Sequence, residues 1–219
     1  MKLLAGLSCL IAGTLAASRT SPPSGCLVVA KSGGQYTSIQ SAVNTLSTSS
    51  GGTQCIFIQP GTYNEQVLVP SRSAQLTIYG YTSDTTRYSA NQVTVTASHS
   101  QAEGLNNDGT ATLRVKAANF RLYNVNVNNG YGKGSQAVAL SAYADSGYYG
   151  CQFTGFQDTL LANEGNQYYA GCLIQGATDF IFGQRAAAWF EGCDIRVLSA
   201  STGYITGELQ LSFLLLLHP

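Results

Sequence analysis

The chain is patterned in short apolar runs that small polar residues separate. Val, Ile, Thr and aromatic residues dominate these runs, and such residues favour strands. Clusters of Gly, Asn and Ser between the runs predict turns. Strands are expected at 26–30, 55–59, 66–70, 74–81, 92–97, 120–127, 148–155, 168–176 and 188–197. This pattern predicts an all-β fold.

One segment has the spacing of an amphipathic helix instead. Thr37 and Ser38 precede the apolar positions of this segment and are candidate N-cap residues. Its apolar residues recur at i, i+3, i+4 and i+7, as Ile39, Ala42, Val43 and Leu46. We predict a helix from about Tyr36 to Leu46.

A Gly-Cys pair recurs along the second half of the chain. Each step is 21 residues, and the pairs are Gly150-Cys151, Gly171-Cys172 and Gly192-Cys193. A constant step of this size with several short strands per unit indicates stacked coils. A parallel β-helix satisfies the pattern, because each coil adds one strand to each sheet. The helix at 36–46 is expected to cap the N-terminal end of this solenoid, since an uncovered end exposes core and strand edges.

The N-terminus resembles a secretory leader. Lys2 supplies a positive start, an apolar run follows from Leu3 to Ala16, and Ala16-Ala17 suits cleavage. A membrane anchor is the alternative, but the run is too short to span a bilayer comfortably. We expect 1–17 to be a signal peptide, 18–206 to be the β-helix domain, and the protein to be secreted and extracellular.

Cleavage of the leader would remove Cys9 and leave five of the six cysteines. An odd number leaves at least one thiol unpaired. Stacked coils would place Cys151, Cys172 and Cys193 in an internal ladder, one per coil. We favour a ladder of small buried residues without a redox role. A disulfide between adjacent coils is the alternative, and the pairing stays open.

Charge and missing motifs narrow the functional classes. The net charge is zero and 10% of the residues are charged, without a Lys/Arg run, so neither nucleic acid nor a membrane is an expected partner. The sequence has no GxSxG, CxxC or HExxH motif, so we expect no Ser-His-Asp triad, zinc site or other metal or cofactor. The glycine-rich run at 130–134 has no phosphate-binding pattern and is interpreted as a loop.

The 21-residue step also links polar residues. It separates Asp158 from Asp179, and Gln136 from Gln157. Stacked strands lie about 4.8 Å apart, so the two carboxylates would face each other. Like charges at that range cannot both ionise easily, so one pKa should rise and the other should stay low. Such a pair can supply a general acid and a nucleophile or base, and the glutamines could donate N–H bonds to an oxyanion.

Two arguments oppose such a site. Gln157 and Asp158 are neighbours, and neighbours on a regular strand point to opposite faces, so the backbone must bend there; Gly155 could help. Each polar residue taken singly could also be a solvated turn residue. The shared spacing and the apolar settings GFQDTLL (155–161) and ATDFIFG (177–183) favour a site.

Four motifs resemble the successive signatures of pectinesterases, and most resemble those of the fungal branch. They are GTYNE (61–65), SQAVAL (135–140), GFQDTL (155–160) and DFIFG (179–183), in the family's order and spacing. The resemblance covers roughly residues 26–206. It implies a right-handed parallel β-helix that hydrolyses methyl esters of galacturonate units in pectin, in cell wall modification and pectin catabolism.

The resemblance also implies roles for the site residues. Asp179 would be the nucleophile that attacks the ester carbonyl. Asp158 would protonate the leaving methanol and then act as a base on the water that clears the acyl-enzyme. Gln136 and Gln157 would stabilise the oxyanion.

Further residues have implied roles of other kinds. Phe156 and Phe180, with nearby tyrosines, would line the sugar-binding cleft. Glu65 of the GTYNE motif would hold a turn near the first coils. Pectin is the expected partner, and the protein is expected to be a monomer.

The sequence departs from the family after GYIT (203–206). The family continues with further coils and a Leu-Gly-Arg-Pro-Trp-like motif whose Arg pairs with the nucleophilic Asp, and no such motif occurs here. We expect 207–219 to be unrelated sequence, such as that of a truncated or misjoined gene; a short C-terminal strand is the alternative. Without the Arg, Asp179 would lose a charge-assisted hydrogen bond.

Other functions stay open at this point. A catalytically inactive, truncated solenoid could bind cell-wall polysaccharide through the same cleft. A polygalacturonase or a pectate lyase would also be a solenoid, but the first is expected to carry a Gly-His-Gly motif and the second a calcium cluster of acidic residues. Methanol release from pectin distinguishes the esterase from all of these.

Overall fold

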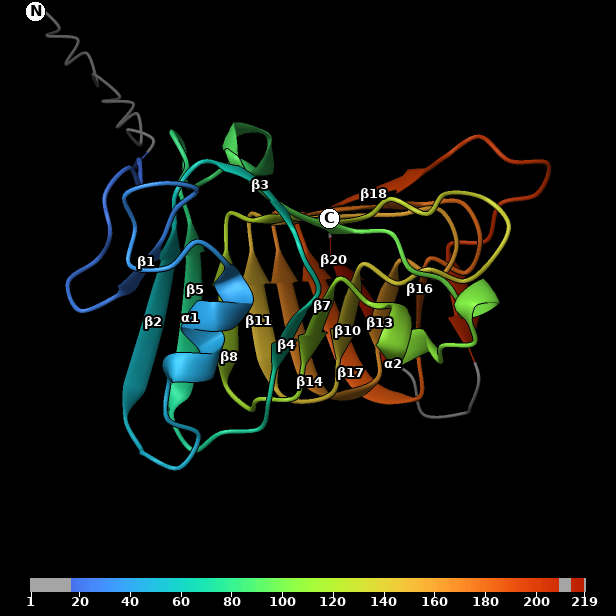
Figure 1. Cartoon of the computed structure of the whole chain (residues 1–219). Coiled ribbons are helices and arrows are strands. Elements are labelled where there is room, and N and C mark those ends of the chain that lie inside the picture. The colour runs from blue at the N-terminus through green and yellow to red at the C-terminus, as the bar shows by residue number, and fades with distance from the viewer. Residues whose placement is uncertain (1–16, 209–213, 219) are drawn as a thin grey trace, which may run out of the picture.

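Three parallel β-sheets run along one solenoid in the computed structural model, which describes residues 17–208 and 214–218 (Figure 1). Neighbouring strands of a sheet come from successive coils and pair in parallel. The expected parallel β-helix is confirmed, with the right-handed crossovers usual for parallel strands. Apart from Ala17, the predicted signal peptide lies outside the described residues.

Within the described residues, the sheets have eight, six and six strands. The first contains, in order, β1 (Leu27–Val29), β2 (Thr53–Ile58), β5 (Gln75–Gly80), β8 (Phe120–Tyr123), β11 (Ser146–Tyr149), β14 (Glu164–Ala170), β17 (Arg185–Glu191) and β20 (Leu214–His218). The second contains β4 (Val67–Val69), β7 (Leu113–Val115), β10 (Leu140–Ala142), β13 (Leu160–Ala162), β16 (Ile181–Gly183) and β19 (Thr206–Glu208). The third contains β3 (Gly61–Asn64), β6 (Val93–Ala97), β9 (Asn126–Asn129), β12 (Gln152–Thr154), β15 (Leu173–Gly176) and β18 (Asp194–Val197).

Coil length differs between the two halves of the solenoid. The predicted 21-residue step is the register of the later coils, where Glu164 of β14 pairs with Arg185 of β17. Earlier coils are longer, and Thr77 of β5 pairs with Arg121 of β8. Insertions account for the extra length, and they carry the short helices η1 (Tyr88–Ala90), η2 (Gln101–Glu103) and α2 (Asn107–Thr110).

All nine predicted runs contain strands, but each of the last four is divided between the first and third sheets. One residue at each division has a positive φ: Asn124 (54°), Gly150 (57°), Gly171 (57°) and Gly192 (56°). These residues occupy equivalent places on successive coils, because the strands that precede them are in register. The single strand expected at 120–127 is therefore wrong; the left-handed residue turns the chain from one sheet into the next.

The second sheet was almost entirely unpredicted from the sequence. Its strands are three residues long, and of its six strands only β4 falls within a predicted run. Runs this short show no clear period. The sheet is nevertheless a continuous parallel ladder, so coil stacking rather than local propensity defines it.

Helix α1 (Ile39–Thr45) begins later than predicted. Tyr36 is extended instead and forms a parallel bridge with Val29. Ser38 is the N-cap, and its side chain accepts a hydrogen bond from the backbone N–H of Ser41. The helix buries its predicted apolar face, including Ile39, and contacts β1, β2 and β4, so it covers the N-terminal end of the solenoid as expected (Figure 1).

Glu65 also caps this helix from a distant part of the sequence. Its carboxylate accepts hydrogen bonds from the backbone N–H groups of Ile39 and Gln40, each at 2.9 Å. It also accepts one from the Ser38 hydroxyl at 3.1 Å. A carboxylate at a helix N-terminus satisfies unpaired donors and complements the helix dipole. The structural role expected for Glu65 is confirmed.

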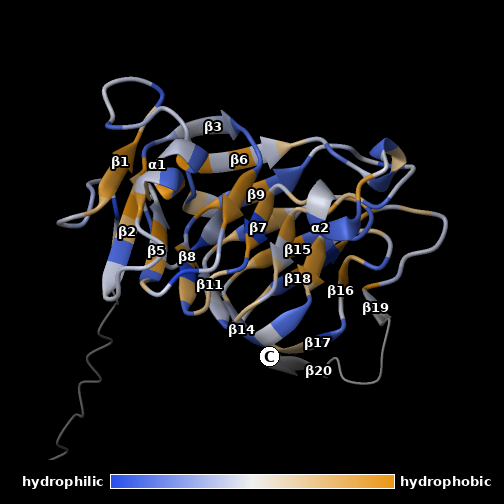
Figure 2. Cartoon of the chain, turned by 60° about the horizontal axis from the view of Figure 1, so that its bottom comes forward, coloured by the Kyte–Doolittle hydropathy of each residue, from blue (hydrophilic) through white to orange (hydrophobic). Residues whose placement is uncertain are grey.

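Apolar side chains fill the solenoid, and the strands carry most of the hydrophobic colour in Figure 2. Tyr148, Tyr169 and Phe190 are buried on three successive coils, with adjacent ring centroids 4.8 and 4.6 Å apart. Stacked aromatic rings add attraction beyond the area that they bury. This stack therefore holds the later coils in one register.

The predicted thiol ladder is confirmed on the same three coils. Cys151 and Cys172 are fully buried, Cys193 is partly buried, and all three are free thiols. The backbone N–H groups of Cys151 and Cys172 each donate to the sulfur of the next cysteine, at 3.3 and 3.4 Å. Burial raises the pKa of the Cys172 thiol well above its usual range, so this thiol is unreactive.

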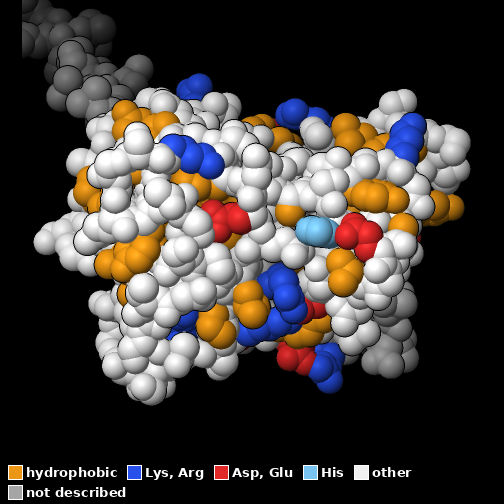
Figure 3. All heavy atoms as spheres, in the orientation of Figure 1, with side chains coloured by type: hydrophobic (Ala, Val, Ile, Leu, Met, Phe, Trp, Pro, Cys, Tyr) orange, Lys and Arg blue, Asp and Glu red, His pale blue; other side chains and the backbone are white. Residues whose placement is uncertain are grey.

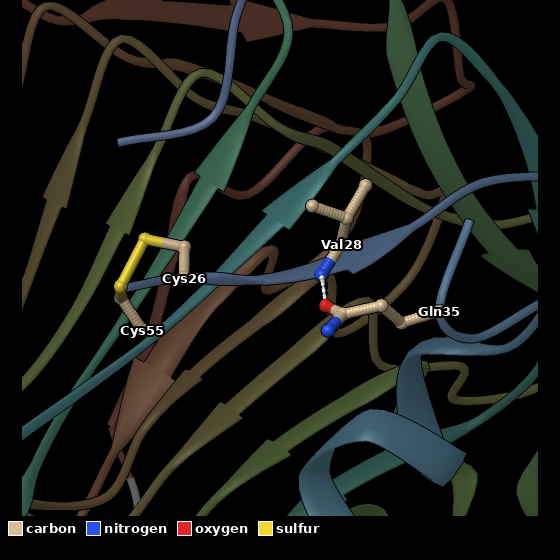
Figure 4. The surroundings of a disulfide bond; sticks show 4 residues. All are labelled: Cys26, Val28, Gln35 and Cys55. Carbon is tan, nitrogen blue, oxygen red and sulfur yellow. Dashed lines mark hydrogen bonds between the residues drawn. A yellow bond between two sulfur atoms is a disulfide. The ribbon is translucent and has the colours of Figure 1, made fainter. Parts of the chain in front are cut away.

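The other two cysteines among the described residues form a disulfide near the N-terminal end (Figure 4). It joins Cys26 to Cys55, whose Cα atoms are 4.6 Å apart, and links the entrance of β1 to β2. Closing a loop of 29 residues removes entropy from the unfolded chain, worth about 3–4 kcal/mol in the chain-entropy model. The sequence pattern left this pairing open.

The segment at 207–219 contains strands in its described part. Gly207 and Glu208 belong to β19, which pairs with β16, and β20 pairs with β17 from Leu214 to His218. This fits the alternative of a C-terminal strand. The expectation that the segment is unrelated sequence stays a prediction. Among the described residues, no helix has the length and apolar character to cross a membrane.

Candidate active site

Four of the predicted site residues line one open cleft beside the second sheet. Its volume is about 250 Å³, and its lining consists of Asn107, Gln136, Gln157, Asp158, Asp179, Phe182 and Gly207. Asp158 and Asp179 each lie two residues before a strand of this sheet, β13 and β16. The cleft is therefore built at the turns that lead into the sheet, where side chains can leave the ladder.

Asp158 and Asp179 occupy equivalent places on adjacent coils. Beyond them Leu160 pairs with Ile181, and the bond that marks this pairing runs from the Leu160 N–H to the Phe180 carbonyl, at 2.9 Å. The Asp158 N–H makes the corresponding bond to the Thr178 carbonyl, at 3.0 Å. The backbones of Asp158 and Asp179 are therefore in register on adjacent coils, one strand spacing or about 4.8 Å apart.

The two glutamines are in register by the same criterion. The Ala137 N–H donates to the Gln157 carbonyl at 3.1 Å, which places Gln136 beside Gln157. Farther along, the N–H groups of Ala139 and Leu140 share the Thr159 carbonyl, at 2.8 and 3.2 Å. This local bulge shortens the register to 20 residues in β10 and β13, where Leu140 pairs with Leu160. The bulge begins only after the glutamines.

Left-handed backbone at the aspartates brings neighbouring side chains into one cleft. Asp158 has φ 61° and Asp179 has φ 47°. Because this conformation breaks strand alternation, Gln157 and Asp158 can both face the cleft. Such a conformation in a residue other than glycine is strained, and strain of this kind gathers at functional sites.

Gly155 has a different role from the bend expected of it. A β-carbon there would lie 2.8 Å from the Thr159 hydroxyl oxygen. The space around the equivalent Gly176 on the next coil is smaller, because a β-carbon at Gly176 would lie 2.3 Å from the β-carbon of Phe180. Glycine is therefore required for close packing under each aspartate turn, while the aspartates themselves supply the bend.

The two carboxyl groups differ in environment. Asp158 is 7% exposed, whereas Asp179 is partly exposed. Burial, and secondarily the charge of Asp179, raise the pKa of Asp158 from 3.8 to about 7. The expected rise of one pKa thus falls on Asp158, which holds a proton near neutral pH. In the part of the chain that the structure describes, no basic side chain forms an ion pair with Asp179.

The aromatic residues are arranged differently from the prediction. Phe180 is 0% exposed in the main core, so its expected contact with a sugar in the cleft is wrong. The left-handed turn at Asp179 directs the next side chain inward. Phe182 lines the cleft instead, although only 3% of it is exposed. Phe156 is partly exposed, and the Lys133 ammonium lies 5.2 Å from its ring centroid.

Besides Phe182, two cleft residues were missed from the sequence. Asn107 comes from α2 in an insertion, and its side-chain oxygen accepts a hydrogen bond from the Gln101 amide. Gly207 lies within the segment predicted to be outside the domain. A β-carbon there would lie 2.8 Å from the Asp179 β-carbon, so glycine leaves room for the carboxylate. The spacing pattern could not place either residue, because neither follows the 21-residue step.

An ion cluster holds the insertion that supplies Asn107. The Asp108 carboxylate contacts Arg114 and Lys116, both at 2.6 Å, and accepts a hydrogen bond from the Ser141 hydroxyl at 2.7 Å. These three contacts lower the pKa of Asp108 although burial opposes them. The cluster ties α2 to β7 and β10, next to the cleft. Fold and cleft together define a parallel β-helix protein with a paired-carboxylate site.

Comparison with known proteins gives the family. A family model of pectinesterases matches residues 26–206. A pectinesterase from Aspergillus aculeatus is 54% identical over 156 residues, which are 70% of this chain and 47% of that protein. A pectinesterase from Aspergillus niger is 56% identical over 163 residues, 73% of this chain and 49% of that protein. The chain belongs to the pectinesterase family and spans about half the length of these curated relatives.

Solved structures agree on the fold. The crystal structure of a pectin methylesterase from Aspergillus niger in deglycosylated form matches with a TM-score of 0.77 and 48% identity, over 81% of this chain and 58% of that one. A pectin methylesterase from carrot matches with a TM-score of 0.71 and 30% identity, over 79% of this chain and 53% of that one. The resemblance to pectinesterases inferred from the motifs is therefore confirmed.

Proposed function

We propose that this protein is a pectin methylesterase, which hydrolyses the methyl esters of galacturonate units and releases methanol and pectate. One observation carries the proposal: Asp158 and Asp179 lie in register in one cleft, and the pKa of Asp158 is raised to about 7. A proton donor beside a carboxylate is the pair that ester cleavage by a carboxylate nucleophile requires.

In the proposed reaction, an Asp179 oxygen attacks the ester carbonyl and forms a tetrahedral intermediate. The C–O bond to the methoxy group breaks as Asp158 donates its proton, and methanol leaves. Water then attacks the acyl-enzyme while Asp158 accepts a proton. The C–O bond to Asp179 breaks, and the free acid and both aspartates are restored. Each bond formed is matched by one broken, and no cofactor is required.

Gln136 and Gln157 are suited to stabilise the intermediate. Both line the cleft beside the aspartates, and their side-chain N–H groups can donate to the oxyanion. A donor already in place when charge develops lowers the barrier, and one such donor typically raises the rate about 10²-fold. Their adjacent positions in the ladder, rather than their spacing in sequence alone, support this role.

The test is methanol release from highly methylated pectin by this protein, by its Asp179→Asn variant, and by a fusion to the C-terminal half of the Aspergillus niger relative. Activity that disappears in Asp179→Asn would support the proposal. Activity in the fusion alone would show that the cleft requires residues beyond those described. A solenoid that binds pectin but releases no methanol in either form would overturn the esterase and favour the inactive binding protein.

We also propose that the protein is secreted as a monomer that acts on pectin outside the cell. The leader pattern at 1–17 supports secretion, and the Cys26–Cys55 disulfide is typical of oxidising compartments. Detection in the culture medium with an N-terminus near Ser18 would support export. Retention inside the cell would contradict it, and gel filtration would test the monomer.

A further inference from the structure

A second cavity lies on the outer face of the first sheet and not beside the paired aspartates. Its volume is about 310 Å³, and its lining consists of Asn166, Gln167, Tyr168, Ala187, Ala188 and Trp189. All six residues belong to β14 and β17, whereas the aspartates precede strands of the second sheet (Figure 1). The two cavities share no lining residue. The proposed esterase reaction therefore leaves this second cavity without a role.

Strand alternation explains how this cavity forms. Along β17, exposed and buried residues alternate strictly, and Ala187 and Trp189 are on the exposed face. On β14, Asn166 pairs with Ala187, and Tyr168 pairs with Trp189. Ala187 has the smallest side chain of these four, so a hollow remains above it. The hollow thus has alanine as its floor, two aromatic side chains on one side and the Asn166 amide across from the floor.

This combination of groups suits a sugar ring. Aromatic rings present apolar faces against which the C–H groups of a pyranose pack, and an amide offers both donors and an acceptor to hydroxyl groups. The polar groups are already held in place. The Asn166 backbone N–H donates to the Asp145 carboxylate at 2.7 Å, and the Tyr168 hydroxyl donates to the Glu191 carboxylate at 2.5 Å. A mainly apolar cavity with a few fixed polar groups is typical of small-molecule sites.

Charges around this cavity favour a neutral sugar over an acidic one. None of the lining residues is charged, but Asp145 and Glu191 contact two of them, and Glu164 lies on the same face of β14 as Asn166. The guanidinium of Arg185 contacts Glu164. Only 10% of the residues are charged, and charges are sparse over the face shown in Figure 3, so this acidic rim is a local feature. It would repel a uronate carboxylate, whereas neutral hydroxyl groups can donate to it.

We propose that this cavity binds a neutral glucan chain of the cellulose type. In such a chain the hydroxyl groups point outward around each ring, so the ring faces present C–H groups to the aromatic side chains while the hydroxyls reach the amide and the carboxylates. The inference goes beyond the proposed function, because the cavity would hold the protein on a neutral polymer while the cleft on another sheet stays open to pectin. Such tethering raises the effective concentration of a substrate in the same wall.

Trp189 is the only tryptophan in the sequence, so its fluorescence reports on this cavity and not on the cleft. Cellohexaose is titrated into the protein at low ionic strength, and we expect a saturable change in tryptophan fluorescence. An unmethylated hexamer of galacturonate should bind this cavity about fivefold more weakly or not at all, because of the acidic rim. Calorimetry measures the affinity of Trp189→Ala for cellohexaose, which should fall about five- to tenfold with the loss of the aromatic contact.

Ala187→Leu and Ala187→Ser form a matched pair at the floor of the cavity. Leucine fills the hollow and should abolish the fluorescence change, whereas serine leaves it open and should keep the affinity within about twofold. Ala187 is exposed, so both variants should fold, and thermal unfolding checks this.

Three results would each overturn the proposal: no saturable binding of cellohexaose, equal affinities in Ala187→Leu and the unaltered protein, or a galacturonate hexamer that changes the Trp189 fluorescence at the same concentrations as cellohexaose. Binding needs no turnover, so a protein that binds cellohexaose here but releases no methanol would contradict the esterase and not this site.

Discussion

Two turns of the later coils use the same left-handed backbone with different residues. At the inner turn between the first and third sheets, Gly150, Gly171 and Gly192 take positive φ values. At the cleft turn before the second sheet, Asp158 and Asp179 take them. Glycine adopts this conformation without strain, so it occupies the turn that only has to redirect the chain. The cleft turn retains carboxylates despite the strain, which indicates that their side chains are needed there.

The largest effect is expected when a carboxylate at the cleft turn is removed and the backbone turn is kept. We expect Asp179→Asn to lower methanol release about 10³-fold or more, because the nucleophile is lost. Asn tolerates left-handed backbone, so stability should hold within about 1 kcal/mol. Asp179→Gly makes the cleft turn like the inner turn and should be equally inactive and still folded. Initial rates and thermal unfolding measure both effects; an active Asp179→Gly would refute the role of the carboxylate.

Substitutions of the glycines packed beneath the cleft turn should have the next largest effect, a loss of stability. Gly176→Ala is expected to destabilise the protein by about 1–3 kcal/mol, because the new β-carbon would meet that of Phe180 and neither can rotate away. Gly155→Ala should cost less, since the Thr159 hydroxyl that it meets belongs to a side chain that can rotate. Gly51→Ala is the control, with open space around it. Denaturant unfolding measures the stability of the three variants. Equal losses of stability in Gly176→Ala and Gly51→Ala would contradict the packing argument.

The two turns should also differ in their response to pH. The pKa of Asp158 is raised to about 7, so the folded protein holds this proton more tightly than the unfolded chain. Its contribution to stability is therefore full below about pH 4 and is lost as pH rises to about 7. Asp158→Asn should raise the free energy of unfolding by about 1–2 kcal/mol above pH 7 and leave it unchanged below pH 4.

Unfolding at several pH values measures this slope, and the thiol ladder provides the control. The Cys172 pKa is raised well above its usual range, so Cys172→Ala should keep the slope of the unaltered protein. Methanol release should also fall as pH rises through about 7, because Asp158 must be protonated to donate. A slope that survives in Asp158→Asn would assign it to another group.

The smallest expected effect is at the inner turn itself. Gly171 has φ 57° and open space around its α-carbon, so Gly171→Ala should cost about 1 kcal/mol through backbone strain alone. Gly171→Asn should cost less, because Asn124 occupies the equivalent place on an earlier coil with φ 54°. Thermal unfolding of both variants tests the ranking, and a larger loss for Asn than for Ala would invalidate the equivalence of the two turns.

A constant step in the sequence determines much of this protein. Where the coils repeat every 21 residues, the spacing in the sequence alone predicts which residues stack, because parallel strands keep equivalent positions adjacent. The thiol ladder and the pairing of Asp158 with Asp179 follow directly. Periodicity likewise located α1, and only its first turn was misplaced, since Tyr36 pairs with a strand.

Tertiary structure decided what no local pattern encodes. The three-residue strands of the second sheet have too few residues for a period, and they form because neighbouring coils offer them partners. Asn107 and Gly207 reach the cleft from segments outside the repeat. The left-handed turn at Asp179 sends Phe180 into the core and leaves Phe182 beside the cleft. Sequence spacing thus determined which residues are neighbours along the solenoid, whereas backbone conformation, set by packing across coils, determined which way their side chains point.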